Sequence, residues 1–214
     1  MIKDLRPDKA FIFRIIHRDN LAWILERGVH CRSAPRVNPA YVDIGNPELI
    51  NKRNSRQLPM APGGTLSDYV PFYFTPRSPM LLNIKTGHNG IRQRGNDEIL
   101  ILVSTLYKVR DHPLNFLFSD RHAYLQTAVF SSDLVGLSAI DWAILQNSDF
   151  KRDTDDLGKF ERYQAEALIY QHMPIGALVG IACVNEAVAA QLRAQVAAAG
   201  ADLKVAVTPG WYFS

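Results

Sequence analysis

Three charged or titratable residues sit inside or beside apolar runs, where their side chains could do chemistry. Glu166 lies within "QAEALIY" (164–170), Arg14 within "FIFRII" (11–16), and His122 shortly after "NFLFSD" (115–120). A charged group in such a run must face a cleft or a partner, because an unpaired buried charge is costly. Arg14 could therefore form a structural ion pair or line a site. Periodicity alone leaves Glu166 as either a helix-face glutamate or a carboxylate held by a strand.

Common catalytic and metal-binding motifs are absent from the sequence. There is no dinucleotide-binding glycine motif, no phosphate-binding P-loop, no H-E-x-x-H and no hydrolase nucleophile elbow. The six histidines show no metal-ligand spacing, and the two cysteines are too few and too far apart for a zinc site or disulfide framework. We therefore expect chemistry without a metal.

The strands and helices that must position these residues are predicted from hydrophobic periodicity and from the positions of proline and glycine. Strands are expected over 11–16, 69–75, 98–104, 115–120 and 177–184, with short ones in 202–207 and 210–213, and helices over 18–28, 137–145 and 185–200. Proline and glycine punctuate residues 33–68, which predicts a long structured loop with one short helix near 47–53. Strands and helices do not alternate regularly, so we predict an α+β fold in a single domain spanning 1–214.

Charge and composition restrict the class of protein, its location in the cell and its partners. The chain is 47% apolar and 21% charged with a net charge of +3, which is ordinary for a globular protein. No run spans a bilayer and the first residues lack a cleavable signal, so we expect a cytoplasmic protein without a membrane partner. No Asp or Glu occurs from Tyr69 to Asn96, where several cations lie. That asymmetry fits either a polyanion-binding face or a solvated basic surface.

Several blocks of the sequence resemble the DarT family of DNA ADP-ribosyltransferase toxins. They are "FRIIHRDNLAWILERGVHC", "INKRNSRQLPMAPGGTLSDY", "DYVPFYFTPRSPML", "FSDRHAYL" and "ERYQAEALIY". The likeness covers nearly the whole chain. It implies the ADP-ribosyltransferase fold, in which two small twisted β-sheets surround an NAD cleft with helices outside. It also implies that NAD is the co-substrate and that ADP-ribose is transferred to a base in single-stranded DNA.

The resemblance implies roles for individual residues. Glu166 aligns with the essential glutamate, whose carboxylate would stabilise the positive charge that develops on the ribose, as in glycosidases. An arginine of "KRNSR" would assist it; Arg53 is favoured over Arg56, although spacing does not decide between them. The cofactor-binding residues would be Arg14, Ile15, Ile16, Asn20, Arg53, Arg56 and His122, with 33–68 as the NAD-binding loop region.

The same resemblance implies a substrate-recognition loop region over 122–166. Cations and aromatic rings suit a flexible single strand through phosphate contacts and base stacking. The expected DNA-binding residues are Arg77, Arg92, Arg94, Lys151, Arg152 and Tyr163. Guanine is favoured as the modified base, with thymine second. A cognate antitoxin that removes the ADP-ribose is the expected partner.

The first strand departs from the common family pattern. Many relatives read aromatic-His-x-Thr there, whereas this chain reads Phe13-Arg14-Ile15-Ile16. We expect Arg14 to grip a phosphate or ribose in place of the imidazole. Two alternatives remain at this stage: a single-stranded nucleic-acid-binding module on a degenerate transferase fold, and a transferase acting on RNA or protein.

Overall fold

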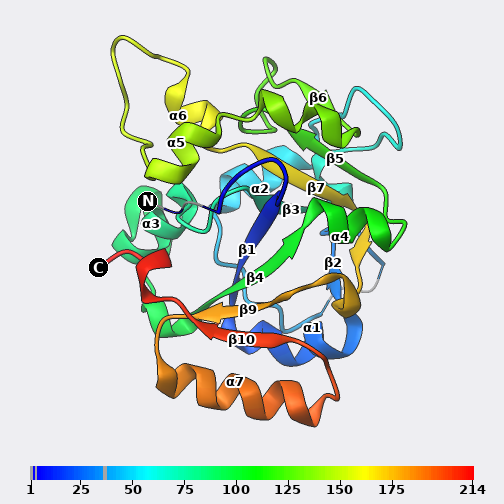
Figure 1. The fold of residues 1–214 in the computed structure, drawn as a ribbon, viewed down its shortest axis with the longest axis vertical. Coiled ribbons are helices and arrows are strands. Elements are labelled where there is room, and N and C mark those ends of the chain that lie inside the picture. Colours follow the sequence, from blue (N-terminus) through cyan, green and yellow to red (C-terminus); the bar gives the residue numbers. More distant parts are fainter. Residues whose placement is uncertain (1, 3, 36–37) are drawn as a thin grey trace.

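The computed structural model describes residues 2, 4–35 and 38–214 (Figure 1). Residues 36 and 37 of the expected NAD-binding loop therefore lie outside the described residues. The strands are β1 (Phe11–His17), β2 (Val29–His30), β3 (Tyr69–Tyr73), β4 (Ile99–Thr105), β5 (Phe116–Ser119), β6 (Phe130–Ser131), β7 (Glu166–Tyr170), β8 (His172–Met173), β9 (Gly180–Cys183) and β10 (Lys204–Val207). The α-helices are α1 (Leu21–Arg27), α2 (Pro47–Arg53), α3 (Pro79–Thr86), α4 (Leu106–Asp111), α5 (Trp142–Asn147), α6 (Lys159–Arg162) and α7 (Glu186–Ala198).

The main sheet has eight strands in the order β10-β9-β4-β1-β3-β7-β5-β6, and β2 pairs with β8 in a separate two-stranded sheet. The main sheet consists of two four-stranded halves. Within one half, β1 pairs with β4 along its whole length, from Phe11–Thr105 to His17–Ile99. Between the halves, β1 and β3 are in register at one pair, Phe13 and Tyr73. The α+β class is confirmed, and the two halves correspond to the two sheets expected around a cleft.

Pro71 explains why the halves separate at this junction. Its carbonyl accepts a hydrogen bond from Nη1 of Arg14 on β1, at 2.8 Å. The N–H and C=O groups of a strand residue point to the same side, so the donor that proline lacks is missing on the side that faces β1. The Arg14 side chain takes the place of the backbone ladder, and the sheet opens there.

The core forms on both sides of this sheet because the strands are apolar on both faces. All of β4 except Thr105 is buried, and so is all of β9. Helix α7 runs along β9 and β10 (Figure 1) and presents Val188, Leu192 and Val196 to them at helical spacing. A second, smaller cluster around Leu66 and Tyr69 lies beneath the long loop. No helix in the described part of the chain is long and apolar enough to cross a membrane.

The loop over residues 33–68 is held at several points although it is mostly irregular. The Asn20 side chain donates to the Val42 carbonyl at 3.0 Å and accepts from the Val42 N–H at 2.9 Å. At the ends of the loop, the Asp68 carboxylate accepts from the hydroxyl of Ser33 at 2.5 Å and from the N–H of Thr65 at 2.7 Å. These contacts fix the path of a segment that has little core of its own.

Most expected elements are present, and two differ from the structure. The short helix expected near 47–53 is α2, with Asn46 capping it. Residues 210–213 do not form a strand: a 3₁₀ turn covers Pro209–Trp211, and the Tyr212 hydroxyl bonds to the sheet instead. The helix expected over 137–145 is divided into a 3₁₀ segment, Leu134–Ala139, and α5, because the Asp141 side chain caps a new start.

Gly28 offers a test of how α1 connects to β2. Its backbone has φ 76° and ψ −172°, and an added Cβ would lie 2.6 Å from the Met173 carbonyl oxygen. We expect Gly28→Ala to lower the free energy of unfolding by about 1–3 kcal/mol, since almost only glycine adopts this backbone conformation. Chemical denaturation measures the change. Gly210→Ala is the matched control, because a Cβ there meets no atom within 4 Å; equal effects of the two changes would contradict this account.

Candidate active site

Glu166 is the first residue of β7, opposite Tyr73 of β3, and its side chain is 2% exposed. One carboxylate oxygen, Oε2, accepts a hydrogen bond from Nη1 of Arg53 at 2.9 Å. The other, Oε1, accepts from the N–H of Ala123 at 3.0 Å and lies 3.2 Å from Nδ1 of His122. Elements far apart in the sequence thus supply three separate groups to one buried carboxylate.

The surroundings of Glu166 keep it ionised. Burial alone would raise its pKa, but the Arg53 guanidinium, the His122 side chain and the Ala123 N–H outweigh burial and lower the pKa to about 2. Tyr73 behaves in the opposite way. Burial and then the negative charge of Glu166 raise the pKa of its phenol, so Tyr73 stays neutral. The site therefore holds one negative charge at neutral pH beside a phenol that keeps its proton.

Arg53 and Arg14 both line the pocket that contains Glu166. Arg53 is the last residue of α2, and Arg14 lies on β1 at the separation of the half-sheets. Each leaves a buried guanidinium nitrogen without a protein partner: Nη2 of Arg53 and Nε of Arg14. Unsatisfied donors at these positions are suited to the oxygens of an anionic or sugar-containing ligand.

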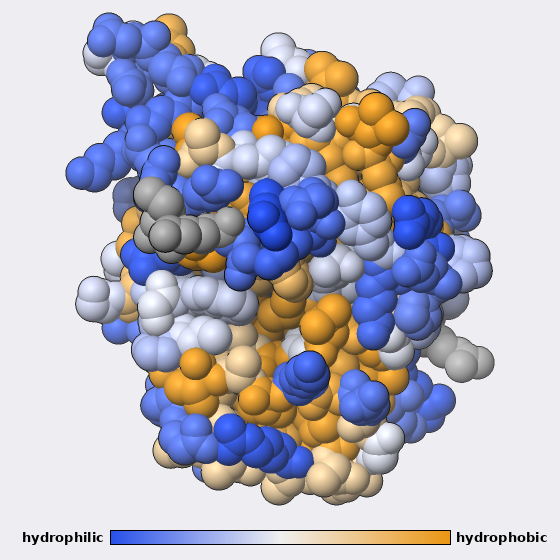
Figure 2. Space-filling model, viewed as in Figure 1, coloured by the Kyte–Doolittle hydropathy of each residue, from blue (hydrophilic) through white to orange (hydrophobic). Residues whose placement is uncertain are grey.

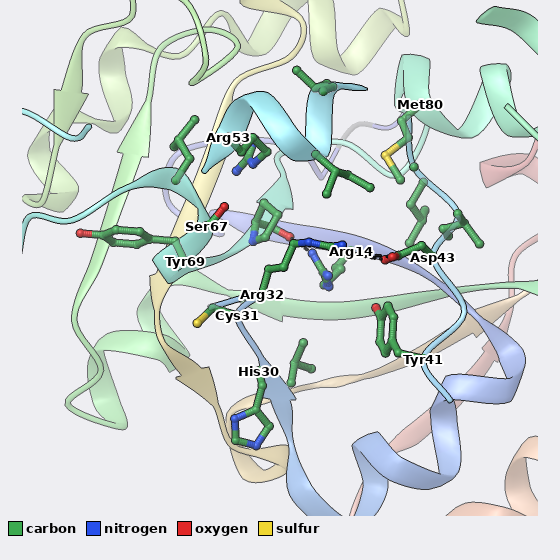
Figure 3. A pocket seen from close by; sticks show the side chains of 18 of the residues that line it. Arg14, His30, Cys31, Arg32, Tyr41, Asp43, Arg53, Ser67, Tyr69 and Met80 are labelled. Atoms are coloured by element: carbon green, nitrogen blue, oxygen red, sulfur yellow. Dashed lines mark hydrogen bonds and ion pairs between the residues drawn. The ribbon is translucent and has the colours of Figure 1, made fainter. Parts of the chain in front are cut away.

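Most of the other residues that line the pocket come from the first part of the sequence. Its further walls come from α1, β2 and the long loop, and include Trp23, His30, Cys31, Asn38 and Tyr41. Figure 3 shows Arg32 and Asp43 pointing towards one another in this pocket, with Arg14 beside them and Arg53 on the helix above. Nη1 of Arg32 lies 3.1 Å from Oδ2 of Asp43, and both side chains are about half exposed. The pocket is therefore lined by two carboxylates, Glu166 and Asp43, and by the arginines that contact them.

The other expected cofactor-binding residues are placed unevenly. Ile15 and His122 line the pocket, whereas Ile16 is fully buried outside the pocket lining. Asn20 is also fully buried, and its amide is occupied by Val42, so it supports the pocket wall from behind.

Arg56 points away from the pocket towards the segment that follows His122. Its Nη1 donates to Oε1 of Gln126 at 2.9 Å, and its Nη2 donates to the Leu125 carbonyl at 3.0 Å. Arg53, in contrast, contacts Glu166 directly. Of the two arginines that spacing could not separate, the structure brings Arg53 to the carboxylate.

The expected DNA-binding residues fall into two groups. Arg92, Lys151 and Arg152 are exposed, and the Arg152 guanidinium lies 4.9 Å from the centre of the Phe160 ring. Figure 2 shows hydrophilic residues gathered at the upper left, where the segment between α5 and α6 projects in Figure 1. Lys151 and Arg152 belong to that segment.

The other three expected DNA-binding residues are buried or bonded to other parts of the protein, which does not favour contact with DNA. Tyr163 is fully buried and its hydroxyl donates to the Arg77 carbonyl at 2.9 Å, so its ring has no free face for a base. Arg94 has a side chain only 8% exposed and pairs with Glu98 at 3.1 Å. The Arg77 guanidinium binds the carbonyls of Gly210 and Tyr212 near the end of the chain.

Sequence reasoning missed several groups of the site. Ala123 contributes only its backbone N–H, so its residue type gives no indication of this role in the sequence. Tyr73 could have been found from strand register, since it lies opposite Glu166. Glu161, five residues before Glu166, is partly buried, and its Oε2 lacks a hydrogen-bond partner. Among residues 2, 4–35 and 38–214, no group of three or more His, Cys, Asp or Glu side chains could hold a metal ion.

The split sheet, the cleft at the split and the buried glutamate at a strand start define an ADP-ribosyltransferase fold. The family model described as "ssDNA thymidine ADP-ribosyltransferase, DarT" matches residues 13–213. The chain therefore belongs to the DarT family, and the family predicted from the sequence is confirmed.

Relatives and solved structures agree with this assignment. A DNA ADP-ribosyl transferase of Escherichia coli O127:H6 is 52% identical over 210 residues, covering 98% of this chain and 96% of that protein. One of Thermus sp. strain 2.9 is 38% identical over 190 residues, covering 87% of each. The structure of Thermus sp. 2.9 DarT in complex with ADP-ribosylated single-stranded DNA has a TM-score of 0.86 at 32% identity, covering 97% of this chain and 98% of that chain.

The contacts of Glu166 predict how stability depends on pH. Its folded-state pKa, about 2, is below the ordinary value of 4.5, so its contribution is present above pH 4.5 and is lost as the pH falls towards 2. We expect the free energy of unfolding of the wild type to fall more steeply over this range than that of Glu166→Gln. Chemical denaturation at a series of pH values measures the two slopes, and parallel slopes would exclude an ionised, stabilised Glu166.

Proposed function

We propose that this chain, as a single domain spanning 1–214, transfers ADP-ribose from NAD to a base in single-stranded DNA and releases nicotinamide. The observation that carries the proposal is the ionised Glu166 held by Arg53 and the Ala123 N–H in a pocket with unsatisfied arginine donors. Relatives bind the corresponding molecules: solved structures include Thermus sp. 2.9 DarT with NAD⁺ and with ADP-ribosylated single-stranded DNA.

The reaction places specific demands on these residues. The bond between nicotinamide and C1′ of the ribose breaks, its electron pair leaves with nicotinamide, and C1′ becomes positive as in glycoside hydrolysis. The fixed carboxylate of Glu166 stabilises that positive charge. A nitrogen of the DNA base then bonds to C1′ and releases its proton to solvent or to a nearby basic side chain.

The arginines serve different parts of the donor in this proposal. Arg14, with a free Nε, binds a phosphate or ribose hydroxyl of NAD and so takes the place of the imidazole that many relatives have on the first strand. Arg53 holds Glu166 through Nη1 and leaves its buried Nη2 free for the donor. Charge-assisted donors of this kind orient a dinucleotide by hydrogen bonds to its oxygens.

The acceptor base is proposed to be guanine, with thymine second. The block "TPRSPMLLNIKTGHNGI" resembles the guanosine-modifying branch of the family more than the thymidine-modifying one, whereas the description of the matching family names thymidine. Lys151 and Arg152, on the projecting segment before α6, are suited to the phosphates of the strand, and the exposed Arg92 adds a third cation. Arg77, Arg94 and Tyr163 are left out of this surface because their side chains are engaged or buried.

Two further parts of the proposal rest on the family. A cognate antitoxin that removes ADP-ribose is the proposed protein partner, and the cytoplasm is the proposed location. A Thermosipho africanus DarTG structure in complex with ADP-ribose matches at 20% identity with a TM-score of 0.74, and this chain covers 51% of it. That likeness shows a shared fold.

The alternative of a nucleic-acid-binding module on a degenerate fold is disfavoured by the site itself. A module that only binds DNA has no need for a buried carboxylate with a depressed pKa between an arginine and a histidine. Transfer to RNA or protein would use the same site, and competition among DNA, RNA and protein acceptors separates these possibilities.

The reaction is tested with labelled NAD and single-stranded oligonucleotides that contain one type of base. We expect transfer to the guanine-containing strand and loss of transfer in Glu166→Ala, since the developing charge then lacks its carboxylate. Mass spectrometry of the product identifies the base and the attachment atom. Glu161→Ala is the nearby control and should retain activity, because the contact of Glu161 with His122 is through its backbone carbonyl. Transfer to thymine alone would overturn the guanine proposal, and transfer to no base would overturn the function.

The two candidate arginines are separated by parallel substitution. Arg53→Ala leaves a buried carboxylate without its cation, so we expect loss of transfer together with destabilisation of about 3–5 kcal/mol. Arg53→Lys keeps the charge but has only one nitrogen, so we expect it to fold and to transfer poorly. Arg56→Ala should bind NAD nearly as the wild type does, as measured by calorimetry. The assignment of Arg53 fails if Arg56→Ala loses transfer while Arg53→Lys retains it.

A further inference from the structure

Ser119 is the last residue of β5 and is fully buried, although it is polar. Its hydroxyl donates to the carbonyl of Arg121 at 2.6 Å. The same hydroxyl oxygen accepts from the backbone N–H of Glu166 at 3.3 Å. One small side chain therefore joins the start of β7 to the turn that follows β5.

That turn carries two of the groups that contact the Glu166 carboxylate. The His122 ring and the Ala123 N–H both lie close to Oε1, and both belong to residues within four positions of Ser119. Further along, the turn is tied by the His122 N–H, which donates to the Glu161 carbonyl at 3.0 Å. At its beginning the Arg121 carbonyl is held by Ser119, so the hydroxyl fixes where the turn leaves the sheet.

We propose that Ser119 is a positioning residue for the transfer reaction, whose hydroxyl fixes the turn that presents His122 and the Ala123 N–H to Glu166. This inference rests on the proposed function. A shift of the turn by a fraction of an ångström lengthens the contacts at Oε1, which are 3.0 and 3.2 Å. By analogy with residues that orient metal ligands, loss of such support costs about 10- to 100-fold in activity.

The charged and titratable groups around Glu166 are not equally dependent on Ser119. Arg53 reaches the carboxylate from α2, Tyr73 lies opposite on β3, and Arg14 lines the same pocket from β1. His122 alone among them belongs to the turn. Removal of the Ser119 hydroxyl therefore weakens the contacts at Oε1 and leaves the Arg53 contact at Oε2.

The test compares Ser119→Ala with Ser104→Ala. Ser104 lies on β4, is also fully buried, and donates to the Ala177 carbonyl at 2.6 Å, outside the pocket lining. The two changes remove the same group with the same burial and the same bond length. For Ser119→Ala we expect kcat to fall by about 10- to 100-fold with KM for NAD within about twofold. We also expect the acidic limb of the pH–rate profile to move to higher pH. Ser104→Ala should leave both unchanged at a similar loss of thermal stability.

A second readout does not need activity. The stability difference between wild type and Glu166→Gln, measured between pH 4.5 and 2, should become less dependent on pH in the Ser119→Ala background. Unchanged kcat and an unchanged pH dependence of stability would overturn the role of Ser119. Equal losses of kcat in Ser119→Ala and Ser104→Ala would also overturn this role, because Ser119 would then contribute only to core packing. Absence of transfer by the wild type would instead count against the proposed function, while the stability readout would still decide whether Ser119 supports Glu166.

Discussion

The separation of β1 from β3 is the constraint on which the site depends. A continuous backbone ladder would close the sheet at this position and leave no room for a ligand between its halves. Pro71 removes a donor on the side facing β1, and the Arg14 guanidinium bonds to the Pro71 carbonyl in its place. The strands stay in register only at Phe13 and Tyr73. The same feature that opens the pocket also places an arginine inside it.

A buried ion pair next to this opening brings its own cost. Glu166 and Arg53 would each be expensive to bury alone, and together they remain favourable only with additional hydrogen bonds. The Ala123 N–H donates such a bond to the other oxygen, and Nδ1 of His122 lies 3.2 Å from that oxygen. Removing either charge leaves the other one buried and unpaired, so stability and chemistry at this position are coupled.

Much of the framework could be predicted from the sequence, because buried strands and capped helices carry strong local patterns. The apolar run of β4, the Asn185-capped α7 and the short α2 all followed from such patterns. The individual DNA contacts were harder to predict. Their charge and aromatic ring predicted that Arg94 and Tyr163 would contact DNA. In the structure, Arg94 pairs with Glu98 and Tyr163 is buried in the core. Local sequence does not report which distant partner a long side chain meets, nor where a backbone N–H such as that of Ala123 will point.

The way in which the loop over 33–68 is attached has a consequence for how such proteins can diverge. Ser33 and Asp68 are bonded to each other, so the loop enters and leaves the domain at nearly one place. An insertion or deletion between these points changes the length of a closed loop and does not shift the strands on either side, at a modest cost in closure entropy. The wall of the pocket can therefore be rebuilt over evolutionary time while the sheet that holds Glu166 keeps its register.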